Sequence, residues 1–187
     1  MARTIGILLF DGAEEMDFAG PWEVFTAAVS GMPSDRVITI GERSRPVTCE
    51  MGMRVIPDLP YGDAPEVDVV LVPGGSGARR EIANPATTNW LRNAAAKCTW
   101  LTSVCTGALL LVGAGLARGR RVTTHHDFIH DLREKCDLGF PSRMRSEYSD
   151  EQSAEQLQVA DHPGDESSPS RQLGQPGYDF RQPQHAC

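Results

Sequence analysis

One cysteine of this chain stands where a fold of strands and helices would place a nucleophile. Cys105 follows the apolar run 99–102 and precedes the helix-like run 109–112, which predicts a strand, a sharp turn and a helix. Unpaired N–H groups at a helix N-terminus favour an anion, so a thiol placed there can have a lowered pKa. We expect Cys105 to be a reactive thiolate near neutral pH; the alternative is a small, buried and inert cysteine.

A carboxylate and a glycine-rich turn follow two other predicted strands. Asp17 comes soon after the first apolar run of the chain, and Gly74 and Gly75 end a later one. The carboxyl ends of parallel strands meet at one edge of a sheet, so these residues and Cys105 are expected to lie together. Asp17 has an alternative role as the cap of a helix that begins near Pro21.

The alternation of apolar runs with helical spacing predicts an open, mostly parallel sheet with helices on both faces. Strands are expected at 5–10, 36–40, 53–56, 67–72, 99–102 and 121–123. Helices are expected at 21–28, at 87–97, after Thr106 and at 125–135, the last with Thr124 as its N-cap.

Other polar residues have simpler structural interpretations. His125 and His126 could act as bases beside the cysteine, but two histidines at a helix start more often cap the helix or lie on the surface. The doublet is too close for a metal site and no third ligand is spaced to complete one, so no metal is expected. Glu23 is expected to make a structural hydrogen bond near the turn. Three further cysteines are expected to be inert thiols: Cys49, Cys98 and Cys136.

Composition narrows the function classes. A net charge of -7 argues against nucleic acid, which needs a basic surface. An odd number of cysteines, five, without paired spacing indicates reduced thiols and a cytoplasmic protein. The first apolar run is too short to span a membrane and no cleavage site for a signal peptide is evident, so no membrane partner is expected.

The chain divides into two parts of different character. Residues 1–136 carry the strand and helix pattern and are expected to form one α/β domain. Residues 137–187 are rich in Ser, Asp, Glu, Gln and Pro and have no apolar periodicity. Such a segment buries too little apolar surface to offset its loss of conformational entropy, so this tail is expected to be disordered.

Four motifs of the first part resemble those of the ThiJ/PfpI family, in the class I glutamine amidotransferase-like superfamily. They occupy residues 17–25, 72–77, 103–108 and 120–125, and the resemblance covers about residues 4–135. It implies a flavodoxin-like three-layer sandwich with a cysteine nucleophile elbow. Members normally continue with further strands and a closing helix, which the tail does not show, so we interpret the chain as a truncated or frame-shifted relative.

Within the family, the motifs resemble the isonitrile hydratase branch, whose enzymes add water to an isonitrile to give an N-substituted formamide. The resemblance implies a homodimer with a small-molecule substrate and no metal or organic cofactor. It makes Cys105 the nucleophile, Thr106 the residue beside it, and Asp17 the acid and base. One carboxyl group can serve both steps in turn, first donating a proton and then activating water.

The resemblance also implies an oxyanion and substrate site at Gly74, Gly75 and His125, with backbone N–H groups of Gly75 and Thr106 facing the developing charge. Two other functions stay open: an amidase or stress-response hydrolase that uses the same cysteine, and the ligand-sensing domain of a transcription regulator. The second would lack its DNA-binding module, because no helix-turn-helix pattern follows the domain.

Overall fold

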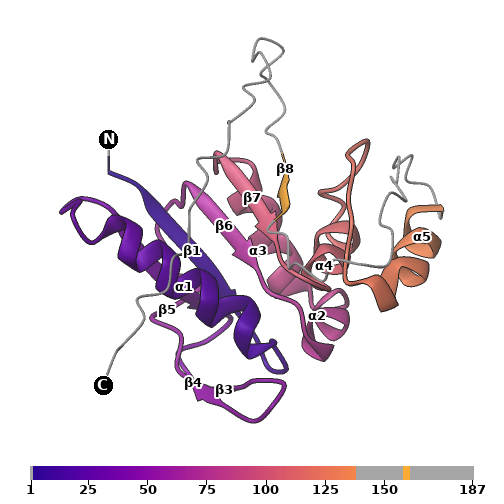
Figure 1. Ribbon diagram of the computed structural model, residues 1–187, viewed down its shortest axis with the longest axis horizontal. Helices are drawn as coiled ribbons and strands as arrows, with labels where there is room; N and C mark the ends of the chain where they lie inside the picture. The colour runs from indigo at the N-terminus through magenta and orange to yellow at the C-terminus, as the bar shows by residue number, and fades with distance from the viewer. Residues whose placement is uncertain (1, 138–157, 161–187) are drawn as a thin grey trace, which may run out of the picture.

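A mostly parallel sheet forms the centre of the protein (Figure 1). The computed structural model describes residues 2–137 and 158–160. Its six main strands stand in the order β5-β2-β1-β6-β7-β8; the first five run parallel, and β8 pairs antiparallel with β7. Their bounds are β1 (Thr4–Leu9), β2 (Arg36–Gly41), β5 (Leu59–Pro60), β6 (Val69–Val72), β7 (Trp100–Ser103) and β8 (Gln158–Ala160).

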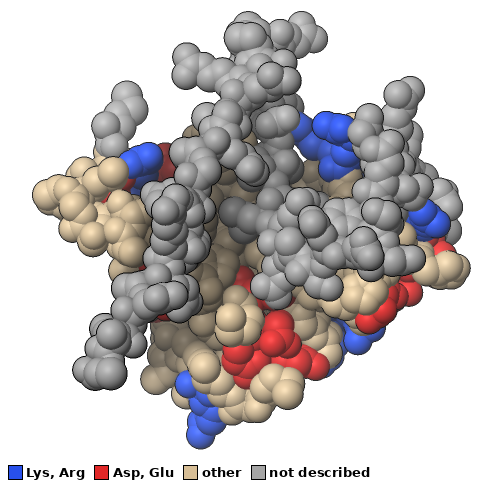
Figure 2. Space-filling view, in the orientation of Figure 1, with Lys and Arg blue, Asp and Glu red and all other residues tan. Residues whose placement is uncertain are grey.

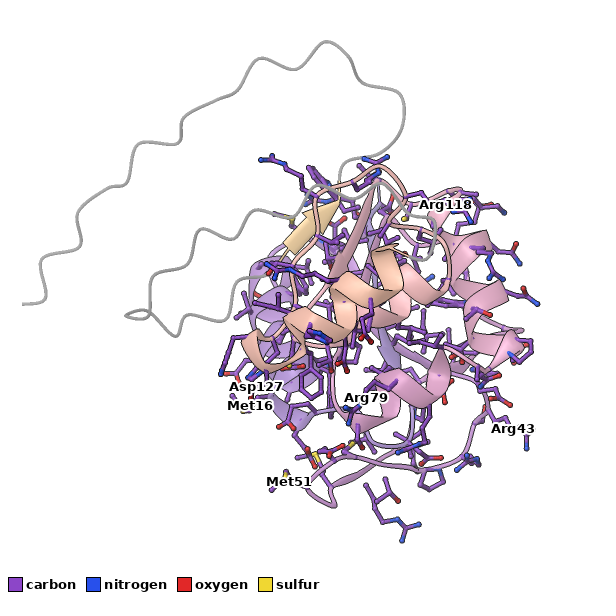
Figure 3. All side chains as sticks on the ribbon, turned by 90° about the vertical axis from the view of Figure 1, so that its right-hand side faces the viewer. Met16, Arg43, Met51, Arg79, Arg118 and Asp127 are labelled. Atoms are coloured by element: carbon purple, nitrogen blue, oxygen red, sulfur yellow. The ribbon has the colours of Figure 1, made fainter. Side chains whose placement is uncertain are left out.

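Helices cover both faces of this sheet, as the uninterrupted apolar strands require. All six residues of β1 are buried, because a parallel strand at the centre of a sheet is covered from both sides. Helix α1 (Glu15–Val29) lies on one face and α3 (Pro85–Ala95) on the other (Figures 1 and 3). The flavodoxin-like three-layer α/β sandwich predicted from the sequence is thereby confirmed.

The remaining helices come after β6 and β7 in the chain. Helix α2 (Ser76–Glu81), which the sequence did not predict, follows β6, and α4 (Gly107–Gly113) follows β7. The short 3-10 helix η1 (His126–Phe128) and helix α5 (Ile129–Asp137) come next. Buried residues from α4, α5 and the segment between them form a second, smaller apolar cluster: Leu109, Val112, Ala117 and Leu132.

Two predicted strands do not belong to the main sheet. The segment near 53–56 is not part of the main sheet: β4 (Arg54–Val55) pairs only with β3 (Val47–Thr48), in a two-stranded hairpin. Residues 121–123 are not a strand, because Val122 packs its side chain against the α4 and α5 cluster and no strand pairs with it in the described part of the chain.

Two predicted helix starts are also wrong. Helix α1 begins at Glu15, six residues before Pro21, and carries this proline in its interior. Proline lacks an N–H donor, so the helix forgoes one backbone hydrogen bond there. Thr124 is not an N-cap; the residue after it, His125, caps η1.

The predicted tail lies outside the described residues, apart from Asp137, which ends α5, and β8. Strand β8 was not predicted from the sequence. None of the helices in the described part of the chain combines the length and the apolar character that crossing a bilayer requires.

Candidate active site

Cys105 occupies a strained turn between β7 and α4. Its φ of 52° is positive, and the described chain contains no other non-glycine residue with a positive φ. This conformation costs an L residue roughly 1–2 kcal/mol, so the surroundings must hold it. The Gly107 N–H donates to the Val104 carbonyl at 2.9 Å, and the Thr124 hydroxyl donates to the Cys105 carbonyl at 3.1 Å. The turn predicted from the sequence is thus present and fixed from both sides.

Asp17 is buried in the first turn of α1, with 2% of its surface exposed. Its Oδ2 accepts a hydrogen bond from the Gly74 N–H at 2.9 Å. The N-cap of α1 is Glu14, whose N–H donates to the Gly74 carbonyl at 3.0 Å. The alternative that Asp17 merely caps a helix is therefore wrong: this carboxylate is held against the end of β6.

The three strand ends meet at Gly74. A Cβ added there would lie 2.7 Å from both the N and the Oγ1 of Thr106, and 2.8 Å from Asp17 Oδ2. Only a glycine leaves room for this approach, so the turn after β6 brings Asp17 beside the residue that follows Cys105. The predicted meeting of the three segments is confirmed.

The N–H groups of the glycine turn already have partners. The Gly75 N–H donates to Thr106 Oγ1 at 3.0 Å, and the Gly74 N–H donates to Asp17. Gly75 itself has a φ of 102°, a conformation suited to glycine. An anion that used the Gly75 N–H would displace the Thr106 hydroxyl, so the oxyanion role of this turn stays a prediction.

The electrostatics of Cys105 differ from the sequence-based expectation. Burial raises the pKa of its thiol most, and the neighbouring charge of Asp17 raises it further. Hydrogen bonds from the backbone and side chain of Thr106 lower the pKa, but the charge of Glu14 adds to the increase. The net shift is upward, so the predicted lowering is wrong. The hydrogen bonds from Thr106, the N-cap of α4, do not offset burial and the charges of Asp17 and Glu14.

Acidic side chains gather near the start of α1, at the lower centre of the view in Figure 2. Their charges also act on Cys49: burial, followed by the charges of Glu15, Asp11 and Glu14, raises the pKa of this thiol to about 11. Cys98 is buried as well, and burial raises its pKa. Both thiols are buried, unlike that of Cys105, which fits the inert role predicted for them.

Thr124, the residue before His125, makes the contact with the cysteine turn. Thr124 bonds to the Cys105 carbonyl, whereas His125 Nδ1 accepts from the Asp127 N–H at 3.4 Å. The capping role that was an alternative for the histidines is the one that His125 has. The sequence showed no third ligand beside the doublet, but the structure places the Asp127 carboxylate within 4.8 Å of both imidazoles.

Two further side chains differ from expectation. Glu23 is exposed on α1 and makes no hydrogen bond or ion pair with the described residues, so its predicted structural bond is absent. Glu50, which the sequence analysis missed, accepts from the Ser76 N–H at 2.9 Å and ties the β3–β4 hairpin to the start of α2. This pairing of distant residues has no signal in sequence spacing.

A separate hollow opens at the carboxyl ends of β1 and β2. It is lined by apolar and charged side chains, among them Phe10, Arg43, Arg45, Tyr61 and Glu81. Cys105 and Asp17 are not among its lining residues, so this hollow is separate from the site at the cysteine.

Comparison with known proteins agrees with the geometry. The chain is 38% identical over 132 residues to the isonitrile hydratase of Pseudomonas putida, covering 71% of this chain and 56% of the hydratase. It is 31% identical over 134 residues to the HTH-type transcriptional regulator GbdR of Pseudomonas aeruginosa, covering 71% of this chain and 36% of the regulator. The chain thus spans about half, or less, of the length of these relatives.

The solved structure of a THiJ/PfpI family protein from Pseudomonas syringae has a TM-score of 0.60 and 27% identity, covering 67% of this chain and 51% of that one. The sequence model of the DJ-1/PfpI family matches residues 3–160, which include every segment that meets at Gly74. The chain therefore belongs to the DJ-1/PfpI family.

Proposed function

We propose that this protein adds water to an isonitrile through Cys105, giving an N-substituted formamide. The observation that carries the proposal is the buried carboxyl group of Asp17, held at the Gly74 turn, whose charge acts on the half-buried thiol of Cys105. A nucleophile beside a proton donor is what this reaction needs. The 38% identity to an isonitrile hydratase supports the choice of substrate class.

The charge balance of the pair defines its reactive form. Two negative charges side by side in a buried site oppose each other, so the pair gives up one proton much more readily than two. The reactive form is a Cys105 thiolate beside a protonated Asp17, because removal of the carboxylate charge removes one cause of the raised thiol pKa. The hydrogen bonds from Thr106 stabilise this thiolate.

The first step joins sulfur to carbon. The Cys105 thiolate attacks the terminal carbon of the isonitrile, and the Asp17 carboxyl group donates its proton to the same carbon. A carbon–sulfur bond forms, the carbon–nitrogen triple bond becomes a double bond, and the product is a thioimidate on Cys105. Asp17 is left as a carboxylate.

The second step releases the formamide. The Asp17 carboxylate takes a proton from water as the oxygen attacks the thioimidate carbon, and this proton passes to the nitrogen. The hydroxyl proton then returns to Asp17 as the carbonyl forms and the carbon–sulfur bond breaks. The cycle ends with a thiolate on Cys105 and a protonated Asp17, and its net change is the addition of one water molecule.

Incubation with a simple alkyl isonitrile, with the formamide detected by mass spectrometry, tests this proposal. Cys105→Ala should form no product, and Asp17→Asn should form it far more slowly than the unmodified protein. Glu23→Gln is a matched control, because it changes an exposed carboxylate to an amide on the same helix. Product formation that survives Cys105→Ala would overturn the proposal.

A second candidate is a ligand-sensing domain, which the 31% identity to the regulator GbdR favours. A cysteine with a raised pKa suits a pocket that binds a ligand without turning it over. Stoichiometric binding of an isonitrile without release of formamide would favour sensing, and release of ammonia from an amide would favour the amidase alternative.

We also infer that two copies of the chain associate. Met16 and Met51 are 62% and 81% exposed and lie at one corner of the molecule (Figure 3). They are held close because the Met51 N–H donates to the carboxylate of Glu15. Exposed apolar side chains that lie together favour association. Light scattering should give the mass of a dimer, and Met16→Ser combined with Met51→Ser should shift it toward the mass of one chain.

A further inference from the structure

Two histidines and an aspartate lie together at the start of η1. One donor atom from each of His125, His126 and Asp127 lies within 4.8 Å of the other two. The Asp127 carboxylate contacts both rings: Oδ1 is 3.1 Å from His126 Nε2, and Oδ2 is 3.7 Å from His125 Nδ1. Figure 3 shows Asp127 at the edge of the molecule, beside open solvent. Two imidazoles and a carboxylate are a donor set that zinc and similar metals use in proteins.

The separations between these atoms lie close to those around a tetrahedral ion. Zinc–nitrogen bonds of about 2.0–2.1 Å and zinc–oxygen bonds of about 2.0–2.2 Å keep neighbouring donor atoms roughly 3.3–3.5 Å apart. The two observed separations lie on either side of this range. We propose that His125, His126 and Asp127 bind a divalent transition-metal ion, Zn²⁺ above all, whose fourth position is taken by water.

The His125 ring is already oriented for this role. Its Nδ1 accepts the hydrogen bond from the Asp127 N–H, so the lone pair of this nitrogen points to the backbone of the residue whose carboxylate Oδ2 lies 3.7 Å away. The bond is 3.4 Å long and correspondingly weak. An ion can replace it at small cost, and the ring need not turn over.

The backbone that carries the three donors is held in place. The Phe128 N–H donates to the His125 carbonyl at 2.9 Å and closes the turn, and the Phe128 ring lies 4.7 Å from the Arg79 guanidinium. On the other side, Thr124 is bonded to the cysteine turn. Metal binding therefore has to order mainly the side chains of His126 and Asp127, which are 78% and 67% exposed.

The turn into η1 brings two consecutive histidines together. His125 is the N-cap of η1, with a ψ of 138°, and His126 is the first residue of the 3-10 helix. The two rings lie with centroids 4.2 Å apart and planes tilted by 32°. The carboxylate that follows reaches back to both rings. This arrangement depends on the η1 turn and is not evident from the spacing of the residue types.

Titration of the full chain with Zn²⁺ by calorimetry, and with Co²⁺ by visible absorption, tests the proposal without any substrate. We expect one equivalent of Zn²⁺ to bind and Co²⁺ to show the intense bands of a tetrahedral site. His126→Gln and Asp127→Ala should each weaken Zn²⁺ binding at least tenfold. Both side chains are exposed, so both variants should keep the circular dichroism spectrum of the unmodified chain.

The controls remove the other histidines of the chain and the Cys105 thiol. His130→Gln is the matched control, because His130 is exposed one turn later and faces Glu134 at 3.7 Å. Combined His162→Gln and His185→Gln removes the remaining histidines, and Cys105→Ala removes the thiol of the candidate active site. All should bind Zn²⁺ as the unmodified chain does. Loss of binding in any of these controls, or absence of binding at millimolar Zn²⁺, would overturn the proposal and leave only a capped turn with an ion pair.

Discussion

Gly74 is the residue around which the site closes, and the addition of one methyl group there tests that geometry. In Gly74→Ala, the new carbon would lie 2.7 Å from Thr106 N and Oγ1 and 2.8 Å from Asp17 Oδ2. Van der Waals contact begins near 3.5 Å, so these atoms must move apart by about 0.7–0.8 Å. Such overpacking costs about 1–3 kcal/mol, which lowers the melting temperature by roughly 2–12 °C for a chain of this length.

The same shift should reduce the reaction rate. A displacement of this size between reacting groups can cost about 100-fold in rate, so formamide production should fall well beyond what partial unfolding explains. Calorimetry and the formamide assay measure the two effects. Gly20→Ala is the control: nothing lies within 4 Å of its new carbon, and alanine favours the α1 helix that contains it. A Gly74→Ala variant as stable and as active as Gly20→Ala would refute the close meeting of the strand ends.

Three further changes test the electrostatics and the strain of the site. Asp17→Asn removes a charge that raises the Cys105 pKa, so iodoacetamide should label Cys105 faster at pH 8. The rate of formamide production should instead fall by roughly 10²–10⁴-fold, because the amide cannot transfer the proton. Unchanged labelling would contradict the effect of the Asp17 charge on the thiol. Cys105→Gly relieves the strain of the positive φ, whereas Cys105→Ala keeps it. In urea titrations the glycine variant should therefore have an unfolding free energy up to about 1 kcal/mol higher than the alanine variant. Equal stability of the two variants would argue against strain at this turn. The thiol of Cys49 has a pKa of about 8.5 in the unfolded chain and about 11 in the folded protein. The stability that this difference contributes is complete below about pH 8.5 and is lost as the pH rises toward 11. Cys49→Ala should therefore flatten the decline of the unfolding free energy over this pH range.

Long apolar segments made the fold predictable. The runs at 5–10 and 67–72 became β1 and β6, because a continuous apolar stretch of this length is covered on both faces when it lies inside a parallel sheet. A strand was predicted at 53–56, but its pairing with β3 in a hairpin was not, since two-residue strands carry no periodicity. Strand β8 is three residues in a polar region, and its pairing with β7 depends on contacts distant in sequence.

The position of the candidate site could be predicted from the sequence, but the direction of the Cys105 pKa shift could not. Residue types at strand ends placed Asp17, Gly74 and Cys105 together, because the topology of a parallel sheet brings those ends to one edge. The direction of the thiol pKa shift is the sum of opposing effects, which depend on burial and on the distances to Asp17 and Glu14. A helix N-terminus can be inferred from sequence, but the burial of the thiol and its closeness to the carboxylates at the start of α1 follow only from the folded structure.

The raised thiol pKa and the strained turn bear on reactivity in different ways, and paired variants separate them. A change of charge at Asp17 should move thiol labelling and catalysis in opposite directions, because the carboxyl group opposes the thiolate yet supplies the proton. A change of shape at Gly74 displaces Asp17 and Thr106 together, so it disturbs the hydrogen bonds that lower the thiol pKa and should depress both. If both variants moved labelling and catalysis in the same direction, the site would act through its shape alone, and the shared proton would have no part in the reaction.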